Sequence, residues 1–404
     1  MNTNTNDADD SPFVSDIKAA RLMPGMYIGG TNQRALHSLV WVLIGHAIHE
    51  CVNRPSNQIM VTIEPGNIVS VADDGSGLPT EIDQSTGRPL IEHDLTTYHR
   101  VGTNWSGHRQ QEGRHHHAYY IGLVVPLALA EKFTVEIKQH GALWRTTYAK
   151  GEIQTALERM GELVDPTETG TTITLQPDYS VFQPVDIDHE YMYRSLRDLA
   201  FLMSQLTVTF EDKRSGVSHP TTTFHFADGT ADFVQHLNRA YKTLHEPLVI
   251  RISGLVELES GSSAELEIDI AVQYTDTDQS MILSYINGHE TEEGGVHVQG
   301  FLDGYYIGLS VADRASKPES QRPYVTDQEA LGGMTAIVSI WYQHPEFEDS
   351  AARKLAGKKV QTLIAELVSD RIIESAPELD GLIDSVIEKW LRNRTERLNR
   401  RYGD

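Results

Sequence analysis

Residues 58–77 read QIMVTIEPGNIVSVADDGSG. Residues 58–62 and 68–72 alternate between apolar and polar side chains, which is the pattern of strands with one buried face. Pro65-Gly66-Asn67 between them is typical of a tight turn. The stretch therefore predicts a β-hairpin that runs into an acidic, glycine-rich turn at Asp73–Gly77.

A helix is predicted before the hairpin, over residues 34–53, because its apolar side chains recur at helical spacing. Further strands are predicted at residues 133–139, 143–149, 169–175, 266–274, 281–287 and 334–341, with an edge strand at 206–211. Further helices are predicted at residues 121–130, 191–203 and 296–309, with two long helices at the end of the chain. Residues 90–113 are polar and irregular, which predicts a long loop or lid. Helices and strands are mixed rather than strictly alternating, so the predicted class is α+β.

The composition is that of a globular protein whose 404 residues suffice for two domains. No apolar run is long enough to span a membrane, and the polar N-terminus lacks the apolar core of a signal peptide. Cys51 is the only cysteine, which favours a reducing, cytoplasmic location. The net charge of −23 disfavours DNA as a partner. The basic stretch 389–401 is the exception: its cations either stabilise a helix C-terminus or contact phosphates or an acidic partner.

Five short blocks occur in order along the chain: PGMYIG at 24–29, DDGSG at 73–77, TGT at 169–171, FLMS at 201–204 and EGGVH at 293–297. Together they resemble the ATPase and transducer half of the gyrase B and topoisomerase IV proteins, which are GHKL ATPases. The resemblance implies a GHKL-type layered α/β sandwich followed by a transducer domain, and a homodimer. It places a flexible N-terminal arm at residues 1–14, the ATPase-like domain at 15–215, and the transducer-like domain with the C-terminal helices at 216–404.

The same resemblance assigns the hydrolytic chemistry to residues that do not fit it. The general base would fall on Val42, which cannot accept a proton, and the magnesium ligand on His46, although Mg²⁺ prefers oxygen. The lysine that reaches the γ-phosphate would be Ala352, unless the register shifts to Arg353 or Lys354. We therefore expect no ATP hydrolysis.

The glycine-rich loop that holds the phosphates would fall on residues 113–122, where at most Gly122 keeps its place and bulky side chains replace the rest. The adenine-recognising residues Asp73 and Thr171 remain, together with Gly77. Two interpretations stay open. Either adenine or another planar heterocycle still binds, or Asp73 and Thr171 only satisfy each other within the sandwich.

Histidines gather where the nucleotide chemistry is lost. His46 and His49 lie three residues apart on the predicted helix, and the replaced loop brings His115–His117 toward the same pocket. Such rings belong to an ordinary surface loop, act as acid, base or substrate ligands, or bind a transition metal; no metal-ligand set is defined. The candidate catalytic residues are His46, His49, Glu50, His116 and His117. The candidate ligand-binding residues are Asp73, Gly77, Thr171, Tyr98, His99, Arg100, Tyr119 and Tyr120.

The leading hypothesis is a repurposed relative that binds a small organic molecule, with or without transforming it, in a histidine-lined pocket. One alternative is a pseudo-ATPase that pairs with a gyrase subunit or acts as a decoy for gyrase inhibitors. The other is an ATP-binding topoisomerase fragment. The sequence identifies neither a ligand nor a reaction.

Overall fold

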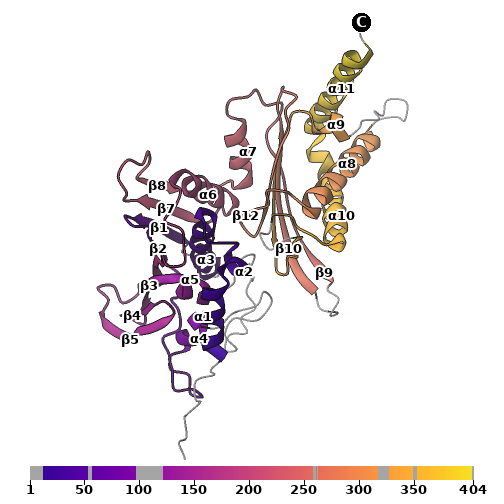
Figure 1. Ribbon diagram of the computed structural model, residues 1–404. Coiled ribbons are helices and arrows are strands. Elements are labelled where there is room, and N and C mark those ends of the chain that lie inside the picture. The colour runs from indigo at the N-terminus through magenta and orange to yellow at the C-terminus, as the bar shows by residue number, and fades with distance from the viewer. Residues whose placement is uncertain are drawn as a thin grey trace, which may run out of the picture. The chain divides into compact units, whose positions relative to one another are not determined.

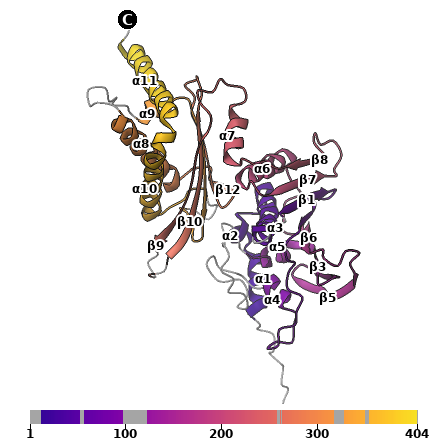
Figure 2. The ribbon, with the colours of Figure 1, turned by 180° about the vertical axis from the view of Figure 1, so that it is seen from behind.

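The computed structural model describes residues 12–52, 57–96, 122–257, 261, 263–316, 327–348 and 353–402. The chain forms two compact units (Figures 1 and 2). The first contains Met1–Ala200 and Gln205–His225, and the second contains Phe201–Ser204 and Phe226–Asp404. No helix among the described residues is long and apolar enough to cross a membrane.

The first unit is built on an eight-stranded sheet in the order β5-β4-β3-β6-β2-β1-β7-β8. Its strands are β1 (Gln58–Glu64), β2 (Ile68–Asp73), β3 (Ala130–Gln139), β4 (Ala142–Ala149), β5 (Glu152–Glu162), β6 (Gly170–Pro177), β7 (Thr207–Asp212) and β8 (Thr221–Phe224). Neighbouring strands are antiparallel except β1 and β7, which run parallel. The sheet therefore joins segments from both ends of this unit.

Helices cover the sheet of the first unit. They are α1 (Pro12–Leu22), α2 (Pro24–Ile28), α3 (Gln33–Val52), α4 (Leu90–Thr96), α5 (Val124–Leu129) and α6 (His189–Leu202). α3 packs on β1 and β2, and α5 contacts α1, α3 and α4, so these four helices gather together (Figure 1). Their core is apolar: Leu39 and Leu43 of α3 are each 1% exposed.

The predicted hairpin is confirmed, since β1 and β2 pair antiparallel around the turn at residues 65–67. The prediction of an edge strand at 206–211 is wrong, because β8 pairs with β7 and takes the edge. The predicted loop over 90–113 is wrong at its start, where α4 forms, and its remainder lies outside the described residues. The expected domain boundary near residue 216 falls before β8, which is part of the first unit's sheet.

The expected N-terminal arm lies mostly outside the described residues, which begin at Pro12. α1 starts there, so residues 12–14 are helical rather than part of a flexible arm.

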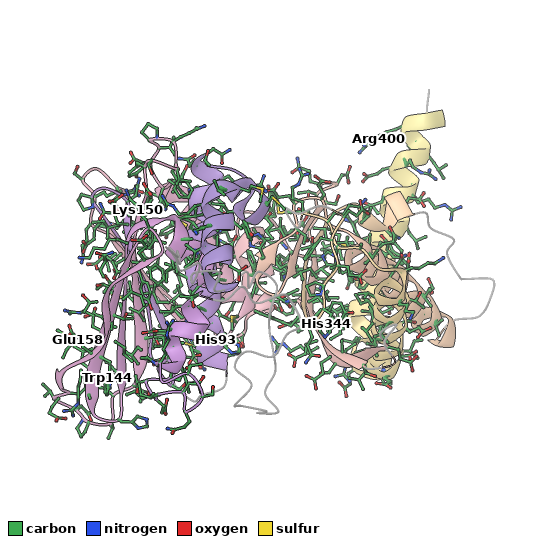
Figure 3. The ribbon with its side chains drawn as sticks, turned by 60° about the horizontal axis from the view of Figure 1, so that its bottom comes forward. His93, Trp144, Lys150, Glu158, His344 and Arg400 are labelled. Carbon is green, nitrogen blue, oxygen red and sulfur yellow. The ribbon has the colours of Figure 1, made fainter. Side chains whose placement is uncertain are left out.

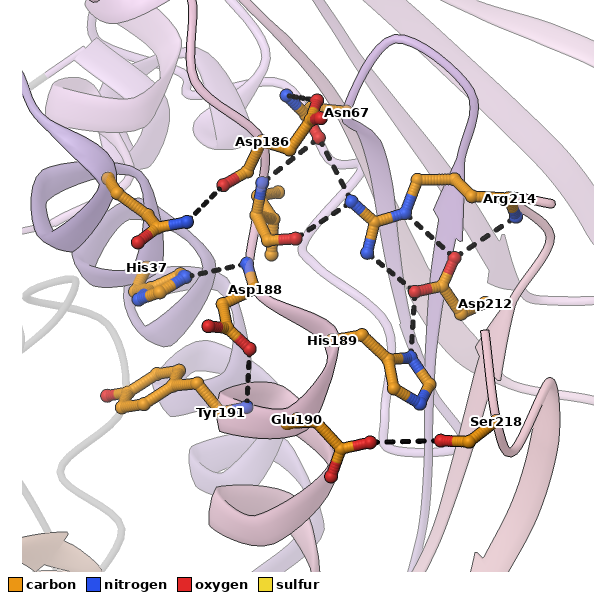
Figure 4. Close-up of polar contacts among 12 residues, drawn as sticks. His37, Asn67, Asp186, Asp188, His189, Glu190, Tyr191, Asp212, Arg214 and Ser218 are labelled. Carbon is orange, nitrogen blue, oxygen red and sulfur yellow. Dashed lines mark hydrogen bonds and ion pairs between the residues drawn. The ribbon is translucent and has the colours of Figure 1, made fainter. Parts of the chain in front are cut away.

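The first unit contains a buried ionic network (Figure 4). Asp212 is 1% exposed and is held by Arg214, whose Nε and NH2 donate to its two oxygens at 2.9 and 2.6 Å. His189 Nδ1 lies 2.9 Å from the same carboxylate. Arg214 NH1 also donates to the carbonyl of Ile187 at 2.8 Å and to Asn67 Oδ1 at 3.4 Å. Asn67 occupies the β1–β2 turn with φ 57°, so the network links that turn to the start of α6 and the end of β7.

The second unit has a five-stranded sheet in the order β12-β11-β13-β10-β9. Its strands are β9 (Leu248–Glu257), β10 (Ser263–Tyr274), β11 (Met281–Ile286), β12 (His289–Glu290) and β13 (Met334–Tyr342). Its helices are α7 (Thr230–Asn238), α8 (Val296–Ser316), α9 (Asp327–Leu331), α10 (Lys358–Ser375) and α11 (Asp380–Tyr402). α7 lies on one face of this sheet, with α8 and α10 on the other (Figures 1 and 2).

Three glycines let α8 lie against the backbone of α10. A Cβ added to Gly300 would meet the carbonyl oxygen of Gln361 at 2.6 Å, and one added to Gly308 would meet Ile372 Cβ at 2.9 Å. At Gly304, one turn from each, the obstacle is the carbonyl group of Ala365. The two helices therefore touch through their main chains, where no side chain fits between them.

The predicted strands at 266–274, 281–287 and 334–341 and the two terminal helices are confirmed. The predicted helix at 296–309 is longer and extends to Ser316. The stretch Phe201–Ser204, expected to close the first domain, belongs to the second unit. Phe201 stacks on Phe226 and Phe233 at centroid distances of 3.6 and 4.7 Å, which explains the assignment.

Candidate functional site

The second half of α3 reaches the surface along a narrow stripe. Val42 is 2% exposed and His46 is fully buried, whereas Gly45, His49 and Glu50 are partly exposed. A Cβ added to Gly45 would have no described atom within 4 Å. Gly45 and His49 lie one turn apart, so the described residues leave space beside the α3 face that carries His49.

His46 is fully buried, whereas His49, three positions further along α3, is partly exposed. Burial lowers the pKa of His46 from 6.5 to about 3. The ring of His46 is therefore neutral at physiological pH and can serve as a hydrogen-bond donor or acceptor but not as a proton shuttle.

The Asp73 turn connects β2 with β6 through short polar contacts. Asp73 Oδ1 accepts hydrogen bonds from the backbone N–H of Gly75 at 2.9 Å and of Thr171 at 3.3 Å. The hydroxyl oxygen of Thr171, 1% exposed, accepts the N–H of Leu78 at 3.2 Å. The predicted pair is thus brought together, and Thr171 contributes its main chain to Asp73 and its side chain to the turn.

Two contacts that hold the turn have no signature in the sequence. Ser76 Oγ donates to Glu50 Oε2 at 2.8 Å, which ties the turn to α3. Gln139, at the end of β3, donates from Nε2 to the carbonyls of Ser76 and Gly77 at 3.3 and 3.4 Å. These partners are 26 and more than 60 residues apart, so no local pattern reveals them.

Gly77 has a structural reason to be glycine. Its φ is +76°, and an added Cβ would lie 2.9 Å from the carbonyl oxygen of Lys138. The position therefore requires glycine for the packing of the turn on β3, independently of any ligand.

The electrostatic surroundings of Asp73 are acidic. Burial, together with the charge of Glu50, raises the pKa of Asp73 from 3.8 to about 7, against the opposing hydrogen bonds from Gly75 and Thr171. Asp74 adds a smaller effect of the same sign as Glu50. Near neutral pH the Asp73 carboxyl therefore exchanges a proton.

This raised pKa makes Asp73 a destabilising group at alkaline pH. The folded chain holds a proton between about pH 4 and 7 that the unfolded chain has released, so stability falls as the pH rises through this window. Asp73→Asn is expected to raise the free energy of unfolding by roughly 2 kcal/mol at pH 8 and hardly at all at pH 4, a value reduced for the partial exposure of Asp73. Denaturant titrations at both pH values measure the difference.

Asp83→Asn is the matched control, because surface hydrogen bonds from Ser85 lower the pKa of Asp83. That variant should lose stability at pH 8 instead. An equal effect of Asp73→Asn at both pH values would contradict the raised pKa.

Comparisons with known proteins point to one family. A family model described as DNA gyrase B matches residues 229–403. The DNA gyrase B protein of Archaeoglobus fulgidus is 31% identical over 392 residues, covering 96% of this chain and 59% of the relative. The 43K ATPase domain of Thermus thermophilus gyrase B, solved in complex with an aminocoumarin, matches with a TM-score of 0.78 and 27% identity, covering 95% of this chain and 96% of that one.

The chain is a gyrase-B-like protein. Its two units have the GHKL-type fold with a transducer, as predicted. The topoisomerase IV ATP-binding domain of Francisella tularensis shares this fold with a TM-score of 0.71 at 22% identity, covering 95% of this chain and 98% of that one. The chain spans 57 to 59% of the length of curated gyrase B relatives such as those of Streptococcus pneumoniae and Archaeoglobus fulgidus.

Several predicted site residues of this gyrase-B-like chain lie outside the described residues. They are Tyr98, His99, Arg100, His115, His116, His117, Tyr119, Tyr120 and Ala352. Within the part that the structure describes, no group of three His, Cys, Asp or Glu side chains is placed to hold a metal ion.

The two cations proposed as replacements for the phosphate-sensing lysine are engaged with carboxylates. Arg353 NH1 lies 2.9 Å from Glu293, and Lys354 Nζ lies 3.0 Å from Glu348. All four side chains are 39 to 53% exposed, so the pairs are weak and can open.

Proposed function

We propose that this gyrase-B-like chain binds a small organic molecule and does not hydrolyse ATP. The observation that carries the proposal is the identity and burial of two α3 residues. The resemblance assigns the base to Val42, which has no proton acceptor, and the magnesium ligand to His46, whose buried neutral ring is a poor partner for Mg²⁺. Without these two groups neither the attacking water nor the metal has its support.

The charge around the Asp73 turn supports a ligand other than a triphosphate. Glu50, Asp73 and Asp74 act on one another as carboxylates, and Glu50 and Asp74 both raise the pKa of Asp73. A ligand that offers an N–H donor stabilises the ionised Asp73 carboxylate, whereas a polyanion adds repulsion. A planar heterocycle with an amino group, or an amine, fits this description.

The partly exposed residues of α3 next to the Asp73 turn form the other side of the proposed binding site. Ser76 links the turn to Glu50, and the space at Gly45 adjoins His49, one turn further along the same helix. His49 and Glu50, rather than the neutral His46, are thus our candidates for any proton transfer. His46 is assigned to hydrogen bonding behind them.

Filling the space at Gly45 tests this placement. In Gly45→Leu the new side chain occupies the volume beside His49, and the loss of a helical glycine should keep or raise the melting temperature. Mass spectrometry of small molecules released from the purified protein is expected to find a compound in wild type that Gly45→Leu has lost. Neither protein should release phosphate from ATP above background.

Gly381→Leu is the control, because an added Cβ at Gly381 in α11 also meets no described atom within 4 Å. It should retain the compound. If Gly45→Leu retained the compound, the binding site would not lie at α3. ATP turnover by the wild type that disappears in Asp73→Asn would refute the loss of hydrolysis.

The second candidate is a binding protein without chemistry, which pairs with a gyrase subunit or retains gyrase inhibitors. The Thermus thermophilus relative was solved with an aminocoumarin, which favours the inhibitor version. Calorimetric titration of the wild-type chain with an aminocoumarin distinguishes the two. Tight binding with no co-purifying metabolite supports the decoy.

A further inference from the structure

A small pocket lies in the second unit, far along the sequence from the Asp73 turn. It has a volume of about 190 Å³, which is smaller than the roughly 300 Å³ or more of drug-sized sites. One wall is α11, and the others are α9 and the loop after β10. The lining side chains with polar groups are Asp278, Glu329, Asn393, Glu396, Arg397 and Arg400.

The outer half of the pocket is electrically balanced. Asp278 Oδ2 lies 2.6 Å from Arg400 NH2, and its Oδ1 lies 3.7 Å from the ammonium of Lys389, which is 1% exposed. Glu396 lies 3.6 Å from Arg400. Arg400 projects near the end of α11 (Figure 3). Two carboxylates therefore face two cations, which favours neither an anionic nor a cationic ligand.

The inner half is balanced as well, by an ion pair of 2.8 Å between Arg397 NH2 and Glu329, which is 2% exposed. Next to it, Asn393 Nδ2 donates to the carbonyls of Glu329 and Gly332 at 2.7 and 2.9 Å. These two bonds fix the orientation of the amide, because only its nitrogen can donate to carbonyl oxygens. Asn393 Oδ1 therefore faces the other way.

Two buried polar atoms of these residues have no hydrogen-bond partner within the described part of the chain. They are the acceptor Asn393 Oδ1 and the donor Arg397 Nε. Buried polar atoms are nearly always paired in folded proteins, so an unpaired one calls for an explanation such as a bound water, ion or ligand. Asn393 and Arg397 are one turn apart on α11, so one small group can reach both. The Arg397 side chain is 40% exposed, so it can turn toward a ligand.

We propose that this pocket binds a small neutral molecule through an amide group. The amide N–H donates to Asn393 Oδ1, and its carbonyl accepts from Arg397 Nε. A carboxylate offers no donor to Asn393, and an amidinium offers no acceptor to Arg397, so each satisfies one of the two atoms only.

Three planar compounds with the same ring separate these cases: benzamide, benzoate and benzamidine. Ligand-observed NMR on the full chain is expected to show benzamide binding with a dissociation constant of about 1 mM, and binding at least tenfold weaker for the other two. A crystal soaked with benzamide locates the compound. Equal binding of benzoate or benzamidine, or benzamide seated elsewhere, would overturn the proposal.

Arg397→Lys keeps the charge opposite Glu329 and removes the Nε–H, so benzamide should bind at least tenfold more weakly. Arg400→Lys changes the same side chain type in the same pocket and should leave the affinity within twofold. Thermal melts of both variants confirm folding, and the wild-type comparison of the three compounds needs no variant. Unchanged benzamide affinity in folded Arg397→Lys refutes the role of Nε.

Discussion

Asp212→Ala is expected to lower the free energy of unfolding of the first unit by about 3 to 5 kcal/mol. The substitution leaves the guanidinium of Arg214, 16% exposed, without its two-pronged carboxylate partner. It also removes the acceptor of His189, whose side chain is 11% exposed. Removal of one member of a buried ion pair is costly, because the remaining charge stays away from water. Denaturant titration followed by fluorescence measures the loss.

Glu168→Ala is the matched control in the same unit. Glu168 pairs with Lys138 at 2.8 Å, but the two side chains are 49 and 47% exposed. An ion pair of this length at the surface should contribute no more than about 1 kcal/mol to the free energy of unfolding. A loss of this small size in Asp212→Ala as well would show that the network does not hold the first unit together.

The network also has a definite pH dependence. Burial by itself would raise the pKa of Asp212, but the hydrogen bonds from Arg214 and His189 outweigh it and lower the pKa. A carboxyl with a lowered pKa stabilises the fold above its unfolded value near 3.8, and the contribution is lost as the pH falls through the folded value. Wild type should therefore lose its advantage over Asp212→Ala in strong acid.

Gly304→Val is expected to lower the free energy of unfolding of the second unit by about 3 kcal/mol or more. The new side chain would meet the carbonyl group of Ala365, which belongs to the backbone of α10 and cannot move aside as a flexible side chain does. α8 and α10 would have to separate, and Ile364 and Ile372, 0 and 1% exposed, would lose packing. A lower melting temperature of the second unit in calorimetry reports this loss.

Gly381→Val in α11 should change stability by no more than about 0.5 kcal/mol, since no described atom lies within 4 Å of a Cβ added there. If Gly304→Val were equally mild, the main-chain contact between α8 and α10 would not determine their packing.

The parts of the fold that the sequence predicts well are those with a strong local pattern. The strands of the hairpin at 58–73 alternate between apolar and polar residues, and the apolar residues of α3 recur at helical spacing, so periodicity predicts both directly. β5 escapes prediction because nearly all of its residues are exposed, so no apolar alternation marks it. β8, only four residues long, escapes prediction as well, and β7 therefore looks like an edge strand in the sequence.

The sequence predicts only those residues of the candidate site that belong to a recognisable motif. The DDGSG block locates Asp73, and TGT locates Thr171, and the two do meet. Spacing places His46 and His49 on one face but cannot reveal that His46 is fully covered, because the covering comes from other elements. The hydrogen bonds from Gln139 to Ser76 and Gly77 form because the tertiary fold brings β3 beside the turn, and no local sequence pattern predicts that.

The parallel pairing of β1 with β7 determines when the first unit can become complete during synthesis. Paired positions such as Thr62 and Glu211 are 149 residues apart. Until β7 has emerged, β1 has an open edge that pairs with whatever strand it meets. Long-range pairing of this kind forms slowly and leaves partly made chains prone to aggregation. A nascent chain halted before residue 207 should therefore depend on chaperones, and one halted after β8 should not.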